Sequence, residues 1–141
     1  MRDRELILRF FALFYARESY TKPMKEFLTR FLAVNRDVSE LQTNEFTELF
    51  ASMCRTCFEA FGSKAFKPKR AVNAALADAV MVGTAERLKK GEIEDLDELK
   101  TLYHTLLENE EFQKKTGSAT TDENTVKERI KLAVEAFDSC P

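Results

Sequence analysis

Two cysteines have the spacing of a chemically active pair, because Cys54 and Cys57 form a Cys-x-x-Cys motif. In thioredoxin-like proteins this motif opens a helix, where the helix dipole lowers the thiol pKa. Here the pair lies in the middle of a predicted helix, on its apolar stripe. A zinc site would need two further ligands, and only His104 and Cys140 are left, at wide and unrelated spacings. We predict buried core cysteines and no bound metal, with zinc or redox chemistry as the alternative.

No other residues combine into a catalytic group. His104 is the only histidine, and it has no visible partner, so we expect a surface or capping residue rather than a base. The four glycines are scattered, and none belongs to a glycine-rich phosphate loop. No nucleophile and base occur at a suggestive spacing. The sequence therefore predicts a protein without catalytic residues or a cofactor, rather than an enzyme.

Four cations, Lys64, Lys67, Lys69 and Arg70, form the best candidate for a binding site. They lie in a predicted loop that leads into a helix N-terminus, where backbone N–H groups and the helix dipole favour an anion. The phosphate of a nucleic acid or of a nucleotide would fit there. The alternative is a solvated loop, because four cations are fewer than a nucleic-acid footprint requires.

Asn73 and Asp78 are polar residues in an alanine-rich segment that we predict to be helical. Either side chain can be buried and hydrogen-bonded, which would fix the register of the helix, or can face water. Neither residue has a visible catalytic partner, so both alternatives remain open.

The elements that would position these residues are helices. Apolar residues recur at steps of three and four, no segment alternates apolar and polar residues, and no hairpin turn signal occurs. We predict an all-α bundle of about six helices, with 109–117 as a short helical turn and a stop. The predicted helices cover about 3–16, 23–34, 40–61, 70–90, 95–108 and 120–137. The chain has 141 residues, 44% of them hydrophobic, which fits a single domain over 1–141.

Start signals support three of these helices. Pro23 is expected at the first helical position of its helix. Ser39 with Gln42, and Thr120 with Glu123, have the spacing of capping boxes. The third helix therefore starts between 40 and 44, and the last one starts just after Thr120.

The first predicted helix is apolar on nearly all sides, so it must be buried on most of them. Glu5 and Arg9 are among its few charges and have the i,i+4 spacing of an ion pair. If the other helices do not enclose this helix, an apolar patch remains for self-association or for a partner chain.

Charge and targeting signals limit the class of protein. The first 91 residues hold 16 Lys and Arg against 11 Asp and Glu, whereas the rest hold 6 against 13. A basic first part can face phosphate or an acidic partner, or can be ordinary solvated surface. The N-terminus makes a poor signal peptide, and no run of about 18 apolar residues predicts a membrane span. We therefore expect a cytoplasmic location, with free thiols for the three cysteines.

Five segments, in order along nearly the whole chain, resemble the GmrSD-like restriction proteins. The shared patterns are D-R-E-L-x-L-R-F-x-A, M-x-x-F-L, F-G-x-x-A-F, N-x-A-L-x-D-A-x-M and a last helix. They match Asp3–Ala12, Met24–Leu28, Phe61–Phe66, Asn73–Met81, and Thr120–Asp122 with Val126 and Arg129.

This resemblance implies a role in DNA restriction and defence against phage. Family members place a ParB-like nuclease or NTPase core, with an I-D-G-Q-Q-R motif, before a helical region. That motif and the His-Asn-His-type nuclease domain of some members are absent here, so the chain resembles the helical region alone, and no family catalytic residue maps onto it. We expect it to begin within what would be the middle of a family member, as a split-gene half, a remnant or an excised domain.

These observations favour a non-catalytic helical module of a GmrSD-like system that serves as a scaffold for docking or for DNA-phosphate contacts. Its expected partners are a nuclease or NTPase core chain, a second copy through the apolar surface around the first helix, or DNA. The main alternative is a stand-alone helical protein–protein interaction module. A metal or redox protein that uses Cys54 and Cys57 is a third hypothesis.

Overall fold

The computed structural model describes residues 2–37, 39–67 and 72–141, with Arg2 described only through its backbone. This part of the chain is all-α and contains no strand, which confirms the predicted fold class. The helices are α1 Arg2–Ala16, α2 Met24–Val34, α3 Glu40–Phe61, α4 Ala74–Leu88, α5 Leu96–Glu108, α6 Glu110–Gly117 and α7 Glu123–Asp138, with a 3-10 turn at Arg17–Ser19.

The described helices number seven rather than six, because 110–117 forms a complete short helix, α6. The Asn109 side chain accepts a hydrogen bond from the Phe112 backbone N–H, and Glu110 and Glu111 lie in the first turn. Both features stabilise a helix N-terminus. Phe112 is fully buried, so packing also holds this helix in place.

Two predicted helix starts are wrong. The helix predicted from 70 begins at Ala74: 70 and 71 lie outside the described residues, and Asn73 is the N-cap, whose side chain accepts from the Leu76 backbone N–H. The last helix is capped by Asp122, not by Thr120. In contrast, the capping box of Ser39 and Gln42 is confirmed, and Pro23 lies one residue earlier than predicted, at the N-cap.

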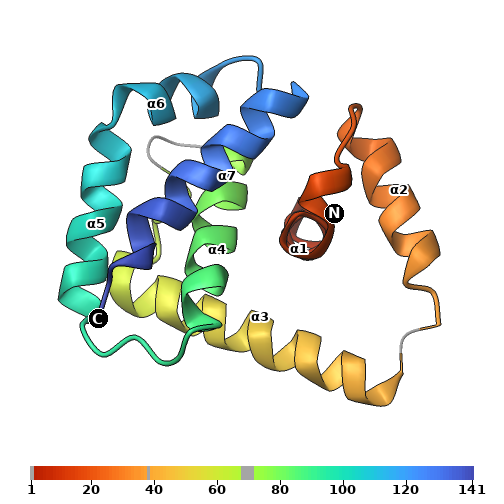
Figure 1. The fold of residues 1–141 in the computed structure, drawn as a ribbon, viewed down its shortest axis with the longest axis horizontal. Helices are drawn as coiled ribbons and strands as arrows, with labels where there is room; N and C mark the ends of the chain where they lie inside the picture. Colours follow the sequence, from red (N-terminus) through yellow and green to blue (C-terminus); the bar gives the residue numbers. More distant parts are fainter. Residues whose placement is uncertain (1, 38, 68–71) are drawn as a thin grey trace.

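Helix α4 is the central element, with α7 along one side of it and α1 and α3 on others (Figure 1). Twelve of its fifteen residues are buried, most of them small or aliphatic. At Gly83 an added Cβ would lie 3.0 Å from the backbone and the Cβ of Ala133. The missing side chain therefore lets α4 and α7 approach closely.

The long helix α3 runs beneath both halves of the molecule (Figure 1). Its 22 residues span about 33 Å, so its two ends have different neighbours. The C-terminal half packs on α4 and α5. Near its N-terminal half, the rings of Phe46 and Phe50 pack against Phe10 and Phe11 of α1, with centroids 5.6–5.9 Å apart.

Helix α2 packs on α1 at the edge of the molecule, and among the described residues no extensive packing joins it to α3 (Figure 1). Only Met24, Phe27 and Leu28 of its eleven residues are buried. The space between α2 and the start of α3 is therefore open to solvent.

Candidate functional site

The predicted cationic site lies in the connection between α3 and α4. Lys64 and Lys67 are both exposed, and the Lys67 backbone N–H donates to the Lys64 carbonyl oxygen in a tight turn. Lys69 and Arg70 lie outside the described residues. Asn73 already accepts the Leu76 N–H at 3.0 Å, so one donor at the α4 N-terminus is used within the chain. Phosphate binding at these four residues stays a prediction.

A groove between α1, α2 and α3 has a volume of about 540 Å³. We call it the α1–α2–α3 groove. It is lined by Tyr15, Ala16, Ser19, Phe27, Arg30, Phe31, Val34, Asn35, Gln42, Glu45 and Phe46. Four of these residues are aromatic, and the volume lies within the range of roughly 300–1,000 Å³ that holds small ligands or a few anchoring side chains.

One wall of the groove contains a packed aromatic pair from α1 and α3. Tyr15 and Phe46 pack together with ring centroids 5.0 Å apart. Val34 lines the groove and is 83% exposed, and Leu32 and Leu41, which are sequence neighbours of the lining residues Phe31 and Gln42, are 56% and 70% exposed.

Polar groups lie at the rim. Arg30 donates from Nη2 to Thr21 Oγ1 at 2.8 Å, and Asn35 donates from Nδ2 to the Phe31 carbonyl oxygen at 2.8 Å. Burial and the nearby Glu45 carboxylate raise the pKa of Tyr15, so its hydroxyl stays protonated at neutral pH. The rim therefore carries one cation, one carboxylate and two amides around an aromatic floor.

Behind the groove, α1 is fixed to the core by a buried group of charges. Asp78 of α4, which is fully buried, accepts from Arg9 Nε at 3.1 Å and from Arg9 Nη2 at 2.6 Å. Arg129 of α7 is also fully buried, with Nη2 3.5 Å from Asp78 Oδ2 and Nη1 2.8 Å from the Thr120 carbonyl oxygen. Of the two alternatives for Asp78, the buried and hydrogen-bonded one is confirmed.

The charges in this group shift the two guanidinium groups in opposite directions. Burial acts to lower the pKa of Arg9, but the hydrogen bond and the charge of Asp78 outweigh it and raise that pKa. Burial lowers the pKa of Arg129. The charge of Asp78 acts to raise this pKa but does not outweigh burial, and the positive charge of Arg9 lowers it further. Within the described residues, Arg129 Nε and Nη2 have no hydrogen-bond partner. Two cations thus share one carboxylate in the interior.

The other candidate residues occupy separate places. Cys57 is buried as predicted and Cys54 is half-buried, and neither forms a disulfide. Burial raises the pKa of Cys54, and raises that of Cys57 to about 12. His104 is exposed on α5. In the described ranges, no three His, Cys, Asp or Glu side chains form a group that could hold a metal ion.

The sequence reasoning missed the α1–α2–α3 groove and the partners of Asp78. The groove has no motif, since its residues come from three helices and depend on α2 standing away from α3. Arg9 and Arg129 are 69 and 51 positions from Asp78 in the sequence. Arg9 was predicted to pair with Glu5, and that ion pair is present at 3.6 Å in addition.

Comparisons with protein-family models, with curated proteins and with solved structures found no match. A search of the described helices found none with both the length and the apolar character needed to cross a membrane.

Proposed function

We propose that this chain is a non-catalytic helical docking module whose α1–α2–α3 groove receives an amphipathic helix of a partner protein. The observation that carries the proposal is the groove of about 540 Å³, which is lined by four aromatic residues and by the solvent-exposed Val34. Helix-in-groove recognition uses bulky apolar anchors on one face of the bound helix. A fourth helix packed here would bury the apolar surface that α2 and α3 leave uncovered.

The charges at the rim define the chemistry of that partner helix. Arg30 and Glu45 lie on opposite helices of the groove, α2 and α3. A bound helix with aromatic or aliphatic anchors, an acidic residue on the α2 side and a basic residue on the α3 side would complement both. Such charge pairs set the orientation and the specificity of binding more than its affinity.

The proposed partner is the nuclease or NTPase core chain of a GmrSD-like DNA-restriction and phage-defence system, of which this chain would be the helical half. Three of the segments that resemble the family supply Arg9, Asp78 and Arg129, and these residues meet in one buried charge group. This convergence supports the view that the matched segments belong to one inherited packing unit. The family assignment itself remains part of the proposal.

The test is binding between this chain and a purified core chain that carries the Gln-Gln-Arg motif. We expect a one-to-one complex by size-exclusion chromatography with light scattering, weakened at least about tenfold, or about 1.4 kcal/mol, by Val34→Asp. The matched control is Phe58→Asp, which places the same charge at a 65% exposed apolar position. Phe58 lies near the C-terminus of α3 and does not line the groove. Equal binding by both variants would contradict the groove as the docking site.

Other outcomes would redirect the assignment. A dimer of this chain that Val34→Asp dissociates would give the groove to a second copy. Binding to an unrelated protein but to no core chain would leave the stand-alone interaction module. Duplex DNA binding that falls steeply with salt and is weakened by Lys64→Ala and Lys67→Ala would support phosphate contacts instead.

A further inference from the structure

A second, smaller cavity lies between the C-terminal half of α3, the connection that follows it, and α4. Its volume is about 170 Å³, and its walls are almost entirely apolar. Sulfur is concentrated there: of the six sulfur-bearing residues described, four line the cavity, namely Met53, Cys54, Cys57 and Met81. No other part of the described chain groups sulfur atoms in this way.

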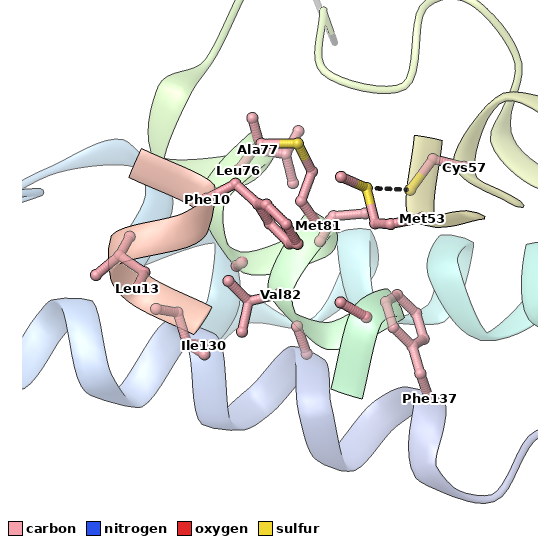
Figure 2. Packing of buried hydrophobic residues seen from close by; sticks show 14 of the residues in the cluster. Phe10, Leu13, Met53, Cys57, Leu76, Ala77, Met81, Val82, Ile130 and Phe137 are labelled. Atoms are coloured by element: carbon pink, nitrogen blue, oxygen red, sulfur yellow. Dashed lines mark hydrogen bonds between the residues drawn. The ribbon is translucent and has the colours of Figure 1, made fainter. Parts of the chain in front are cut away.

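Two of these sulfur atoms already have the spacing of ligands to one ion. The Cys57 thiol donates to the Met53 thioether with the sulfur atoms 3.7 Å apart (Figure 2). Two sulfur ligands at about 2.3 Å from a shared three-coordinate ion, at an angle of about 120°, lie roughly 4.0 Å apart. Small side-chain movements would therefore suffice to place an ion between Met53 and Cys57.

Further sulfur donors lie within the same walls. Cys54 precedes Cys57 by one turn of α3, and both residues line the cavity. Met81 reaches it from α4, and its unbranched side chain can reorient at little cost because three of its bonds rotate freely. Cys54 is half-buried, so an ion from solvent can approach the cavity on its side.

We propose that this cavity binds a soft monovalent metal ion, Cu(I), through the Cys57 thiolate and the Met53 and Met81 thioethers. A donor set of one thiolate and two thioethers favours Cu(I), because zinc takes thiolate, imidazole and carboxylate ligands and magnesium takes oxygen ligands. On binding, one thiol releases its proton to water and forms a thiolate–Cu(I) bond. One thiolate with thioether ligands cancels the single positive charge, so the apolar cavity holds a neutral group.

The experiment is an anaerobic titration in which Cu(I) is supplied as its bicinchoninate complex and the loss of that complex is followed by absorbance. We expect the folded wild-type chain to remove one equivalent of Cu(I), with a native mass spectrum of one copper per chain. Cys57→Ser and Met53→Leu should each lower the affinity by at least roughly 10–100-fold, the loss found even for outer-shell partners of metal ligands. Cys140→Ser, which changes a buried cysteine outside this cavity, should bind as the wild type does.

Two controls keep the result interpretable. Met53→Leu conserves volume, so it tests the thioether even if Cys57→Ser does not fold. X-ray absorption of the copper-loaded chain should record sulfur neighbours only. The proposal is overturned if both variants bind Cu(I) with wild-type affinity, if Cys140→Ser is the variant that loses binding, or if the copper has nitrogen or oxygen ligands.

Discussion

Two regions of the molecule differ in how they treat apolar side chains. One is the contact between α4 and α7, and the other is the face formed by α2 and the start of α3. On the first, small residues bring two helices into backbone contact, as Gly83 and Ala133 illustrate. On the second, large apolar residues such as Val34 and Leu41 stay in solvent. The first region is buried by contacts between helices, whereas the second leaves apolar side chains in solvent, and we propose that a partner helix covers them.

One buried charge group joins the two regions. Arg9 belongs to α1, against which α2 packs, whereas Arg129 belongs to α7, and both contact Asp78 on α4. A buried ion group often stabilises less than an apolar core of the same shape would. Here the charge group fixes the position of α1 on the α4–α7 pair, and α1 in turn forms one wall of the groove.

The largest effect is expected for Asp78→Ala, which leaves the buried Arg129 guanidinium without an anionic partner and Arg9 with Glu5 alone. We expect a loss of about 3–5 kcal/mol in the free energy of unfolding, measured by urea denaturation. Asp138→Ala, which breaks the exposed ion pair with Lys90, is the control and should cost less than about 1 kcal/mol. If both variants lost a similar free energy of unfolding, the buried charge group would contribute no more than the exposed ion pair, which would contradict its role in joining the two regions. If Asp78→Ala does not fold, Asp78→Asn takes its place.

The next effect concerns the close contact of α4 with α7. Gly83→Ala places a Cβ 3.0 Å from Ala133, including its backbone, so a helix must shift. We expect a loss of about 1–3 kcal/mol by the same measurement. Gly117→Ala, at a site with no atom within 4 Å of the added Cβ, should be neutral or stabilising by up to about 1 kcal/mol. A destabilisation as large at Gly117 would contradict the argument from close packing.

The helical content could be predicted from the sequence because each helix has its own apolar period. The capping box of Ser39 and Gln42 is local, so it too was predictable. The start of α4 could not be predicted in this way. In the sequence, Ala71 and Val72 continue the apolar pattern of the helix, but the Asn73 side chain caps the helix N-terminus by accepting the Leu76 N–H. At this position the apolar pattern predicts an earlier helix start than the capping hydrogen bond allows, and the helix begins where the cap places it.

The site was less predictable than the fold. Burial of Asp78 depends on Arg9 and Arg129, and nothing in the spacing of these three residues shows that they meet. The groove depends on α2 standing apart from α3, which is a tertiary property. The contact of Met53 with Cys57 follows from their i,i+4 spacing on a predicted helix, whereas no spacing predicts that Met81 reaches the same cavity from α4.

A smaller effect is expected at the Arg17–Glu86 ion pair, where the end of α1 meets α4. Burial acts to raise the pKa of Glu86, but hydrogen bonds from Arg17 and Lys89 outweigh it and lower that pKa below its usual value of 4.5. The pair therefore stabilises the folded state fully above about pH 4.5 and loses this contribution as the pH falls through the folded-state pKa. Glu86→Gln should cost less than about 1 kcal/mol at pH 7, and this difference should shrink in acid. A difference that grows as the pH falls would contradict the assigned sign.

The smallest effect on the free energy of unfolding is expected for Val34→Ser in the groove, where we expect the largest effect on binding. Val34 is 83% exposed and lines the groove, so Val34→Ser removes almost no packing from the folded chain. The free energy of unfolding should change by no more than about 0.5 kcal/mol, whereas the affinity for a helix bound in the groove should fall. Met53→Ala, a fully buried change, should do the reverse by costing about 2–5 kcal/mol. If Val34→Ser destabilises the chain as Met53→Ala does, the α2 face is part of the core and the contrast between the two regions is wrong.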